Sequence, residues 1–134
     1  MHDIFIMKVK KIAIGAIIRN SKGELLLQYR NKGRYVDRWV LFGGHMLSGE
    51  NYEQALRREL MEELELKVKR LVFFDTYEDE TAITPIYIVE ESVELSQLVL
   101  HEGQGMRFFK PDELKDLDIG FNQREILMDF LRIK

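Results

Sequence analysis

Short runs of apolar, β-branched residues recur along the chain between polar turns, and these runs predict β-strands. The first two lie at 8–20 and 24–30, joined by a turn at 20–23. A polar, basic loop follows them, and an acidic turn separates two of the later strands. These later strands are predicted at 39–45, 71–77, 82–89 and 106–109.

Two segments carry the signals of helices. Asn51 and Gln54 have the spacing of a capping box, ahead of a helix predicted over 52–64. Asn122 and Glu125 repeat that spacing before the last apolar stretch. The order is strands, helix, strands, helix. It predicts the α/β (α+β) class, with a mixed β-sheet that carries a helix on each face.

Composition limits the kinds of protein that this chain can be. Its 134 residues fit one domain, 1–134, and its 46% hydrophobic and 32% charged fractions are ordinary for a globular protein. The chain has no cysteine, which excludes disulfides, thiolate metal sites and thiol catalysis. A net charge of −3 offers no basic field to a nucleic-acid duplex or an anionic membrane.

No segment carries a membrane or export signal. The longest apolar run is 12–18, whereas about 20 apolar residues are needed to span a bilayer. The N-terminal segment lacks the succession of charged, apolar and small residues that marks a signal peptide. We therefore expect a cytoplasmic protein without a membrane partner.

The predicted helix over 52–64 crowds three carboxylates together. Residues advance by about 100° along a helix, so Glu59, Glu62 and Glu63 fall within an arc of about 100°. Glutamate favours helices and dissolves well, so the triplet alone also fits a plain solvated surface. The sequence before it changes this interpretation. The glycines at 43–44 allow close backbone approach, and Arg58 can hold a carboxylate or a phosphate with two donors.

The same segment resembles the conserved box of the Nudix hydrolase family, and it resembles the MutT-like members in particular. A glycine, four glutamates and an arginine stand at the spacing of that box: Gly44, Glu50, Arg58, Glu59, Glu62 and Glu63. The order of strands around the box extends the resemblance over nearly the whole chain. The resemblance implies a Nudix-type α/β/α sandwich and the hydrolysis of a nucleoside diphosphate that is linked to another group.

Two positions depart from the family pattern. Glu65 stands where the family usually has a glycine, and Phe42 stands where proline often precedes the double glycine. A left-handed residue is often needed where a helix ends, and a side chain there costs about 1–2 kcal/mol. Neither change removes a candidate ligand.

The resemblance implies a metal site for Mg²⁺ (or Mn²⁺). Its ligands would be Glu59, Glu62 and Glu63, joined by the backbone carbonyl of Gly43. Hard divalent cations of this kind prefer oxygen ligands. The role implied for Arg58 is to orient a carboxylate of the box.

Two further glutamates have roles implied by the family. Glu50 would brace the junction between the loop and the helix. Glu102 lies in an E-G-Q segment like the one that brings a further carboxylate to the metals in MutT-type enzymes. The residue that takes the proton from water is left open among Glu59, Glu62 and Glu102.

Four residues are candidates for binding the substrate. Arg30 and Arg38 flank the basic loop, and MutT-like enzymes place an arginine at the first of these positions on the phosphates. Gly44 belongs to the loop that would approach the phosphates. Asn122 lies about where these enzymes use an asparagine on a purine, although a helix N-cap also explains it.

The leading functional prediction is hydrolysis of a nucleoside triphosphate, oxidised or non-standard ones included, to the monophosphate and pyrophosphate. ADP-ribose, nucleotide sugars and dinucleoside polyphosphates are alternative substrates. A non-catalytic regulatory module that binds nucleotides is the alternative of another class, but it predicts erosion of the acidic box. The family also implies a small-molecule nucleotide as partner, and family members of this size are often homodimers.

Overall fold

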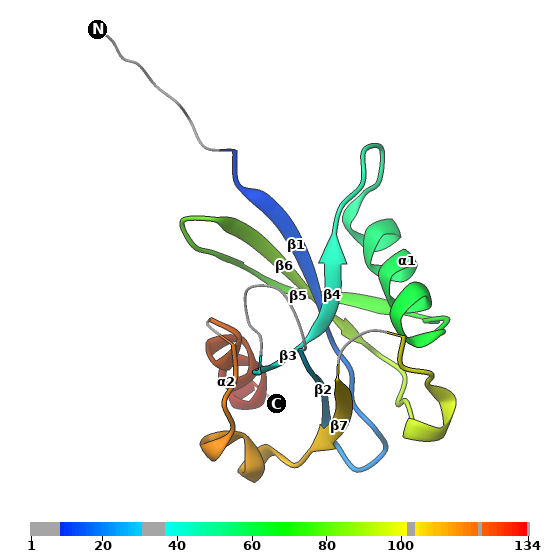
Figure 1. Ribbon diagram of the computed structural model, residues 1–134, viewed down its shortest axis with the longest axis vertical. Helices are drawn as coiled ribbons and strands as arrows, with labels where there is room; N and C mark the ends of the chain where they lie inside the picture. The colour runs from blue at the N-terminus through cyan, green and yellow to red at the C-terminus, as the bar shows by residue number, and fades with distance from the viewer. Residues whose placement is uncertain (1–8, 31–36, 102–103, 121, 134) are drawn as a thin grey trace, which may run out of the picture.

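A computed structural model describes residues 9–30, 37–101, 104–120 and 122–133 (Figure 1). Within these residues the strands are β1 (Lys11–Ile17), β2 (Leu25–Tyr29), β3 (Trp39–Val40), β4 (Phe42–His45), β5 (Leu71–Glu78), β6 (Ala82–Val89) and β7 (Gly105–Phe109). The α-helices are α1 (Tyr52–Leu64) and α2 (Gln123–Ile133), and short 3₁₀ helices are η1 (Leu95–Gln97) and η2 (Pro111–Asp116).

The strands form two sheets. One is a four-stranded mixed sheet in the order β4-β1-β6-β5, in which β1 and β6 run parallel and the other neighbours run antiparallel. The other is an antiparallel sheet in the order β3-β2-β7. The predicted α/β class with a mixed sheet and helices is confirmed, and the strands are divided between two sheets.

Two hydrophobic clusters hold the helices against the sheets. Leu56, Leu60 and Leu64 of α1 are fully buried in one cluster, together with alternate residues of β1. Ile126 and Leu127 of α2 are buried in the second cluster. Figure 1 shows α1 and α2 on opposite sides of the molecule. Because side chains alternate along a strand, β1 contributes to both clusters and stands between them.

The chain changes sheets at Leu41, between β3 and β4. The sequence predicts one continuous strand over 39–45, but the structure interrupts it at this residue. Two side chains from elsewhere bond the Leu41 backbone. Its N–H donates to Oε1 of Gln123 at 2.6 Å, and its carbonyl accepts from Nε2 of Gln28 at 3.3 Å. Both backbone groups are therefore satisfied where the strand leaves its sheet.

Both ends of α1 have the capping features that the sequence predicts. The capping box is present, because the Gln54 N–H donates to Asn51 Oδ1 and the Asn51 N–H donates to Gln54 Oε1. Glu65 ends the helix with φ 53° and ψ 33°, so the left-handed conformation expected there is confirmed. Helix α2 begins at Gln123, directly after Asn122.

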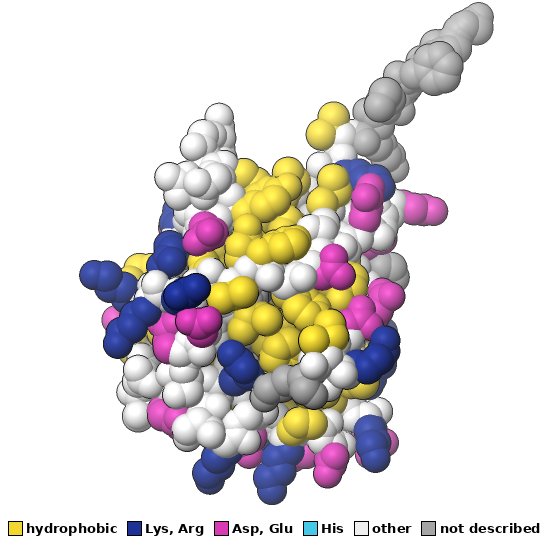
Figure 2. Space-filling view, turned by 180° about the vertical axis from the view of Figure 1, so that it is seen from behind, with side chains coloured by type: hydrophobic (Ala, Val, Ile, Leu, Met, Phe, Trp, Pro, Cys, Tyr) yellow, Lys and Arg dark blue, Asp and Glu magenta, His cyan; other side chains and the backbone are white. Residues whose placement is uncertain are grey.

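Charged and hydrophobic side chains are distributed unevenly over the surface. Figure 2 shows hydrophobic side chains gathered at the centre of one face, with Lys, Arg, Asp and Glu interspersed around them. Within the described ranges, no helix is long and apolar enough to cross a membrane.

Candidate active site

Arg58 of α1 is the centre of a network of ion pairs. Its Nε and Nη2 atoms donate to the two carboxylate oxygens of Glu50, at 2.7 and 3.1 Å. Its Nη1 atom donates to Glu59 at 2.8 Å and to Glu62 at 3.2 Å. Its Nη2 atom also donates to the backbone carbonyl of His45 at 3.0 Å. One guanidinium therefore joins the helix to the end of β4.

The network also fixes the loop between β4 and α1. Glu50 accepts from Arg58 in bidentate fashion and from the Leu47 N–H at 2.8 Å. The hydrogen bonds from the guanidinium and from this backbone N–H lower the pKa of Glu50. The hydrogen bond to Glu50 and the one to Glu59 in turn raise the pKa of Arg58. Both groups therefore stay charged at neutral pH.

The double glycine brings the backbone close to its neighbours. A Cβ atom on Gly44 would lie 1.9 Å from Oε2 of Glu59, and one on Gly43 would lie 1.9 Å from the backbone oxygen of Ile14. Gly43 is paired with Gly15 of β1 in the sheet. Any larger residue at either position would displace its neighbour, so the glycines let β4 lie against both β1 and the Glu59 carboxylate.

The three carboxylates of the helix have different surroundings. The side chain of Glu59 is 17% exposed and that of Glu62 is 58% exposed. Glu63 is buried, with 7% of its surface exposed, and it faces a cleft. Within the described ranges, no three Asp, Glu or His side chains converge closely enough to hold a metal ion by themselves.

These residues nevertheless fit a magnesium ion. Mg²⁺ usually binds one or two carboxylates and completes its octahedron with water and substrate phosphates, so it does not need an all-protein cage. Glu59 and Glu63 supply oxygens from adjacent turns of α1, and the close approach of Gly44 brings β4 against the Glu59 carboxylate. The donors are all hard oxygens, which suits this ion.

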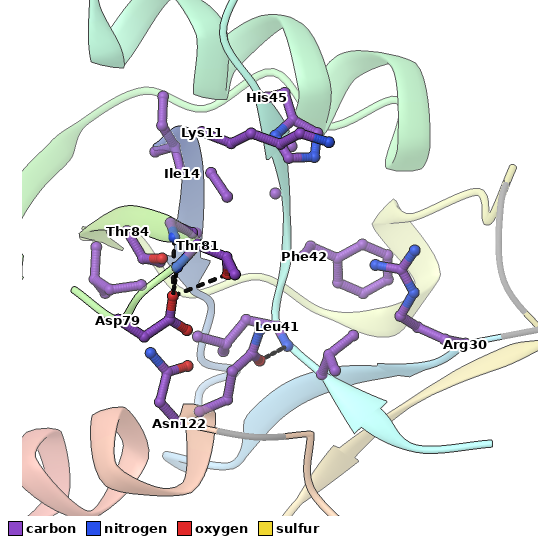
Figure 3. Close-up of a pocket in the computed structure, with 18 of the residues that line it drawn as sticks. Lys11, Ile14, Arg30, Leu41, Phe42, His45, Asp79, Thr81, Thr84 and Asn122 are labelled. Carbon is purple, nitrogen blue, oxygen red and sulfur yellow. Dashed lines mark hydrogen bonds between the residues drawn. The ribbon is translucent and has the colours of Figure 1, made fainter. Parts of the chain in front are cut away.

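A cleft of about 680 Å³ extends from this region across the face of the mixed sheet. Five residues predicted as site residues line it: Arg30, Gly43, Gly44, Glu63 and Asn122. Figure 3 shows His45 and Lys11 at one end, Asp79 and Asn122 at the other end, and Arg30 to one side. The cleft therefore brings together residues that are far apart in the sequence.

Four other predicted residues form the ion-pair network beside the cleft, namely Glu50, Arg58, Glu59 and Glu62. Arg38 pairs with Asp118, with 3.7 Å between Nε and Oδ1, and is not among the residues that line the cleft. Glu102 lies outside the described residues. His101, the residue before it, contacts the carboxylate of Glu65 at 2.5 Å through Nε2.

Sequence reasoning missed several residues of the cleft. Lys11, Gln28, Asp79 and Thr84 also line it. The acidic composition of the turn between β5 and β6 was visible in the sequence, but its place at the cleft depends on the pairing of β6 with β1. The one sequence signal for Lys11 and Thr84 is the alternation of side chains along β1 and β6, which shows that each lies on the same face as its neighbours two residues away.

Comparison with known proteins identifies the family. The NUDIX domain family matches residues 9–130. The chain therefore belongs to the Nudix family of pyrophosphohydrolases, whose members are typically dependent on divalent metal ions.

Individual relatives lie within the same family. The nucleoside triphosphatase NudI of Escherichia coli is 31% identical over 126 residues, which cover 83% of this chain and 89% of NudI. An 8-oxo-dGTP diphosphatase of Buchnera aphidicola is 41% identical over 68 residues. That second match spans about half of each protein, 51% of this chain and 52% of the relative. A MutT Nudix hydrolase from Burkholderia pseudomallei has the same fold, with a TM-score of 0.75, 25% identity, and 90% of this chain and 97% of that chain covered.

Proposed function

We propose that this chain is a divalent-metal-dependent hydrolase that converts a nucleoside triphosphate to the monophosphate and pyrophosphate. One observation carries the proposal. One cleft is lined both by residues of the acidic box region and by candidate substrate-binding residues. The first are Gly43, Gly44 and Glu63, and the second are Arg30 and Asn122. Its volume of about 680 Å³ lies within the range of small-molecule sites, roughly 300–1,000 Å³.

In this proposal, the box residues hold the metal and order the site. Glu59, Glu62 and Glu63 would hold Mg²⁺ or Mn²⁺, and the ion would supply positive charge to the phosphates and make a water molecule more acidic. Arg58 keeps two of these carboxylates at fixed positions, since it contacts Glu59 and Glu62 while Glu50 holds its other side.

Two other residues of the cleft, Arg30 and Asn122, are proposed to hold the substrate. The Arg30 guanidinium faces the cleft and can bind phosphate oxygens with two donors. The amide of Asn122 both donates and accepts hydrogen bonds, as recognition of a base requires. Three carboxylates are candidates for accepting the proton of the attacking water, namely Glu59, Glu62 and Glu102.

The relatives support a triphosphate over other substrates. NudI is a nucleoside triphosphatase by name, and the Buchnera relative is an 8-oxo-dGTP diphosphatase. Both names describe nucleotides without a second sugar or a second nucleoside. This agrees with the leading prediction, and ADP-ribose, nucleotide sugars and dinucleoside polyphosphates rank below it.

A product assay tests the proposal. The panel contains canonical and oxidised nucleoside triphosphates, ADP-ribose, nucleotide sugars and diadenosine polyphosphates, each with Mg²⁺ and with Mn²⁺. The expected products are a monophosphate and pyrophosphate from at least one triphosphate. Two monophosphate products from ADP-ribose or a sugar nucleotide would support the alternative. No turnover of any compound would support a regulatory module that only binds nucleotides.

Thermal unfolding gives a second test that needs no turnover. A ligand that binds only the folded state stabilises it by about 2.7 kcal/mol at a concentration one hundred times its Kd. Mg²⁺ together with a product monophosphate should therefore raise Tm. The Glu63→Gln variant should lose the part of this rise that depends on the metal.

A further inference from the structure

The end of the cleft around Asp79 has the form of a shelf on the mixed sheet. Strands β1 and β6 are adjacent and parallel, with Lys11 beside Ala82 and Gly15 beside Ile86. Ala13, Gly15, Ala82 and Thr84 line the cleft from these two strands. Helix α2 packs on the neighbouring part of the sheet, where Ile17 and Ile86 are buried beneath it.

The shelf carries little side-chain bulk at Ala13, Gly15 and Ala82. Ala13 and Ala82 project only a methyl group from the sheet. At Gly15 there is no side chain, and a Cβ there would come within 2.9 Å of Cδ1 of Ile86, so Ile86 covers this part of the floor. A surface made of these small residues and Ile86 leaves room for a planar ring.

Polar side chains stand around one end of the shelf. Figure 3 shows Asp79, Thr81 and Thr84 at this end, with Asn122 facing them from the segment that leads into α2. All of them line the cleft. A planar ring on the shelf would therefore meet a carboxylate, an amide and hydroxyl groups at its edge.

The Asp79 carboxylate is held in place by its own turn. Its Oδ1 atom accepts from the Thr81 N–H at 2.7 Å, the Thr81 hydroxyl at 3.0 Å and the Ala82 N–H at 2.8 Å. The Asp79 N–H also donates to the Ala82 carbonyl at 3.0 Å. Because Oδ1 already accepts three hydrogen bonds within the turn, the donors of a ligand would meet Oδ2, and one carboxylate oxygen has about two acceptor sites.

We propose that Asp79 is the residue that selects the base, and that it favours a base whose edge presents two adjacent N–H donors. This proposal rests on the proposed function, since it places the base of the nucleotide on the shelf. Guanine has such an edge, formed by its ring N1–H and its 2-amino group. Adenine presents a ring nitrogen acceptor beside its amino group. This acceptor and the carboxylate would repel each other, because neither carries a proton to donate.

Binding of monophosphates tests the selection without requiring catalysis. Dissociation constants for GMP, IMP, XMP and AMP are measured by calorimetry with the wild type, Asp79→Asn and Glu80→Gln. IMP lacks the 2-amino group, and XMP carries an oxygen in its place. A hydrogen bond to a charged group contributes enough to predict that the wild type binds GMP roughly tenfold or more tightly than IMP.

The asparagine variant separates base selection from a role in the turn. Its side-chain oxygen can still accept from the Thr81 and Ala82 N–H groups, while an NH₂ donor replaces the second oxygen. Asp79→Asn should therefore lose the preference for GMP over IMP and gain about tenfold in affinity for XMP. Glu80 belongs to the same turn and also lines the cleft, so Glu80→Gln is the matched loss of one charge and should keep the wild-type preferences.

The proposal would be wrong if the wild type bound GMP and IMP equally tightly. It would also be wrong if Asp79→Asn still preferred GMP over IMP, or if this variant bound all four monophosphates more weakly by the same factor. The compound 8-oxo-GMP shares the edge of GMP and differs on the far side of the ring. Asp79→Asn should therefore weaken the binding of GMP and of 8-oxo-GMP by the same factor. Weaker binding of only one of the two would mean that Asp79 does not contact the edge that they share. Selective GMP binding without hydrolysis of any triphosphate would leave the base selection standing and remove the proposed catalysis.

Discussion

The two ends of the cleft are built in opposite ways. Beside the end near α1, Arg58 and its carboxylate partners come from one helix and the loop before it, and contacts between 2.7 and 3.2 Å join them. At the other end, Asp79 and Asn122 are 43 residues apart in the sequence, and the tertiary fold brings both to the cleft. We infer that the first end governs the rate for every nucleotide, whereas the second end chooses among nucleotides.

The largest expected effect belongs to the end near α1. Glu63→Gln should lower kcat by about a hundredfold or more, because a neutral amide is a poor ligand for a hard cation at a buried position. The loss should be the same for all triphosphates that the wild type hydrolyses. Steady-state kinetics with Mg²⁺ measure it, and circular dichroism checks the fold.

Glu53→Gln is the matched control for this variant. Glu53 lies in the first turn of the same helix, and the only ion pair it is seen to make among the described residues is with Arg57, at 3.9 Å. Its rate should stay near that of the wild type. A Glu63→Gln enzyme with a normal rate in Mg²⁺ would mean that the metal site has been assigned to the wrong residues.

Gly44→Ala should have the next largest effect. Its Cβ would lie 1.9 Å from the Glu59 carboxylate, so that side chain must move away from its contact with Arg58. We expect a loss of roughly tenfold or more in kcat, again for all nucleotides, with a cost in stability of about 1–3 kcal/mol. Gly105→Ala is the control, because nothing lies within 4 Å of a Cβ there. Equal rates for the two alanine variants would contradict the close approach of Gly44.

Tyr77→Phe tests the other end through stability. The Tyr77 hydroxyl donates to Asp129 of α2 at 2.8 Å, just before the turn that carries Asp79. Loss of this hydrogen bond should cost about 1 kcal/mol in urea unfolding. The rates for different triphosphates should change relative to one another more than in the Gly44 variant.

Tyr77 also predicts how stability depends on alkaline pH. Burial, and then the hydrogen bond to Asp129, raise the pKa of Tyr77 above its usual value near 10. Below pH 10 the tyrosine is neutral in both the folded and the unfolded state, and its contribution to stability is complete. As the pH rises further, only the unfolded state ionises, so stability falls. The fall should be shallower in Tyr77→Phe, and an unchanged slope would contradict the assignment.

The smallest expected effect is that of Glu65→Gly at the end of α1. Glycine should relieve the left-handed backbone by about 1 kcal/mol. Loss of the exposed contact with His101 offsets part of this gain, since such pairs contribute about 0–1 kcal/mol. We therefore expect a small net rise in stability. His101→Gln removes the contact alone and should change stability by less than about 0.5 kcal/mol; a destabilised Glu65→Gly would show that the contact outweighs the strain.

The sequence predicted the end near α1 well because its chemistry is local. A helix repeats every 3.6 residues, so the spacing of Glu59, Glu62 and Glu63 already places them on one face. The caps at Asn51 and Glu65 followed from the residues next to the helix. Metal binding by these carboxylates stays a prediction from the family resemblance.

The other end could not be predicted because it depends on contacts between distant segments. The alternation along β1 shows that Ala13 and Gly15 share a face, but the sequence does not say which strand lies beside it. The parallel pairing with β6 brings the turn at Asp79 to the cleft. The break at Leu41 likewise depends on side chains of Gln28 and Gln123, which the local pattern of 39–45 does not contain.

The bond from Leu41 to Gln123 has a consequence for the order in which the protein matures. The ribosome releases α2 long after β4 and the acidic helix, yet the first residue of α2 holds the strand that leads into Gly43 and Gly44. A nascent chain that already contains the whole acidic box would therefore lack one support of its double glycine. Pulse-labelling hydrogen exchange at the Leu41 amide would time this step, and we expect protection to arrive only with α2. The double glycine would then reach its final position only after α2 has emerged and folded.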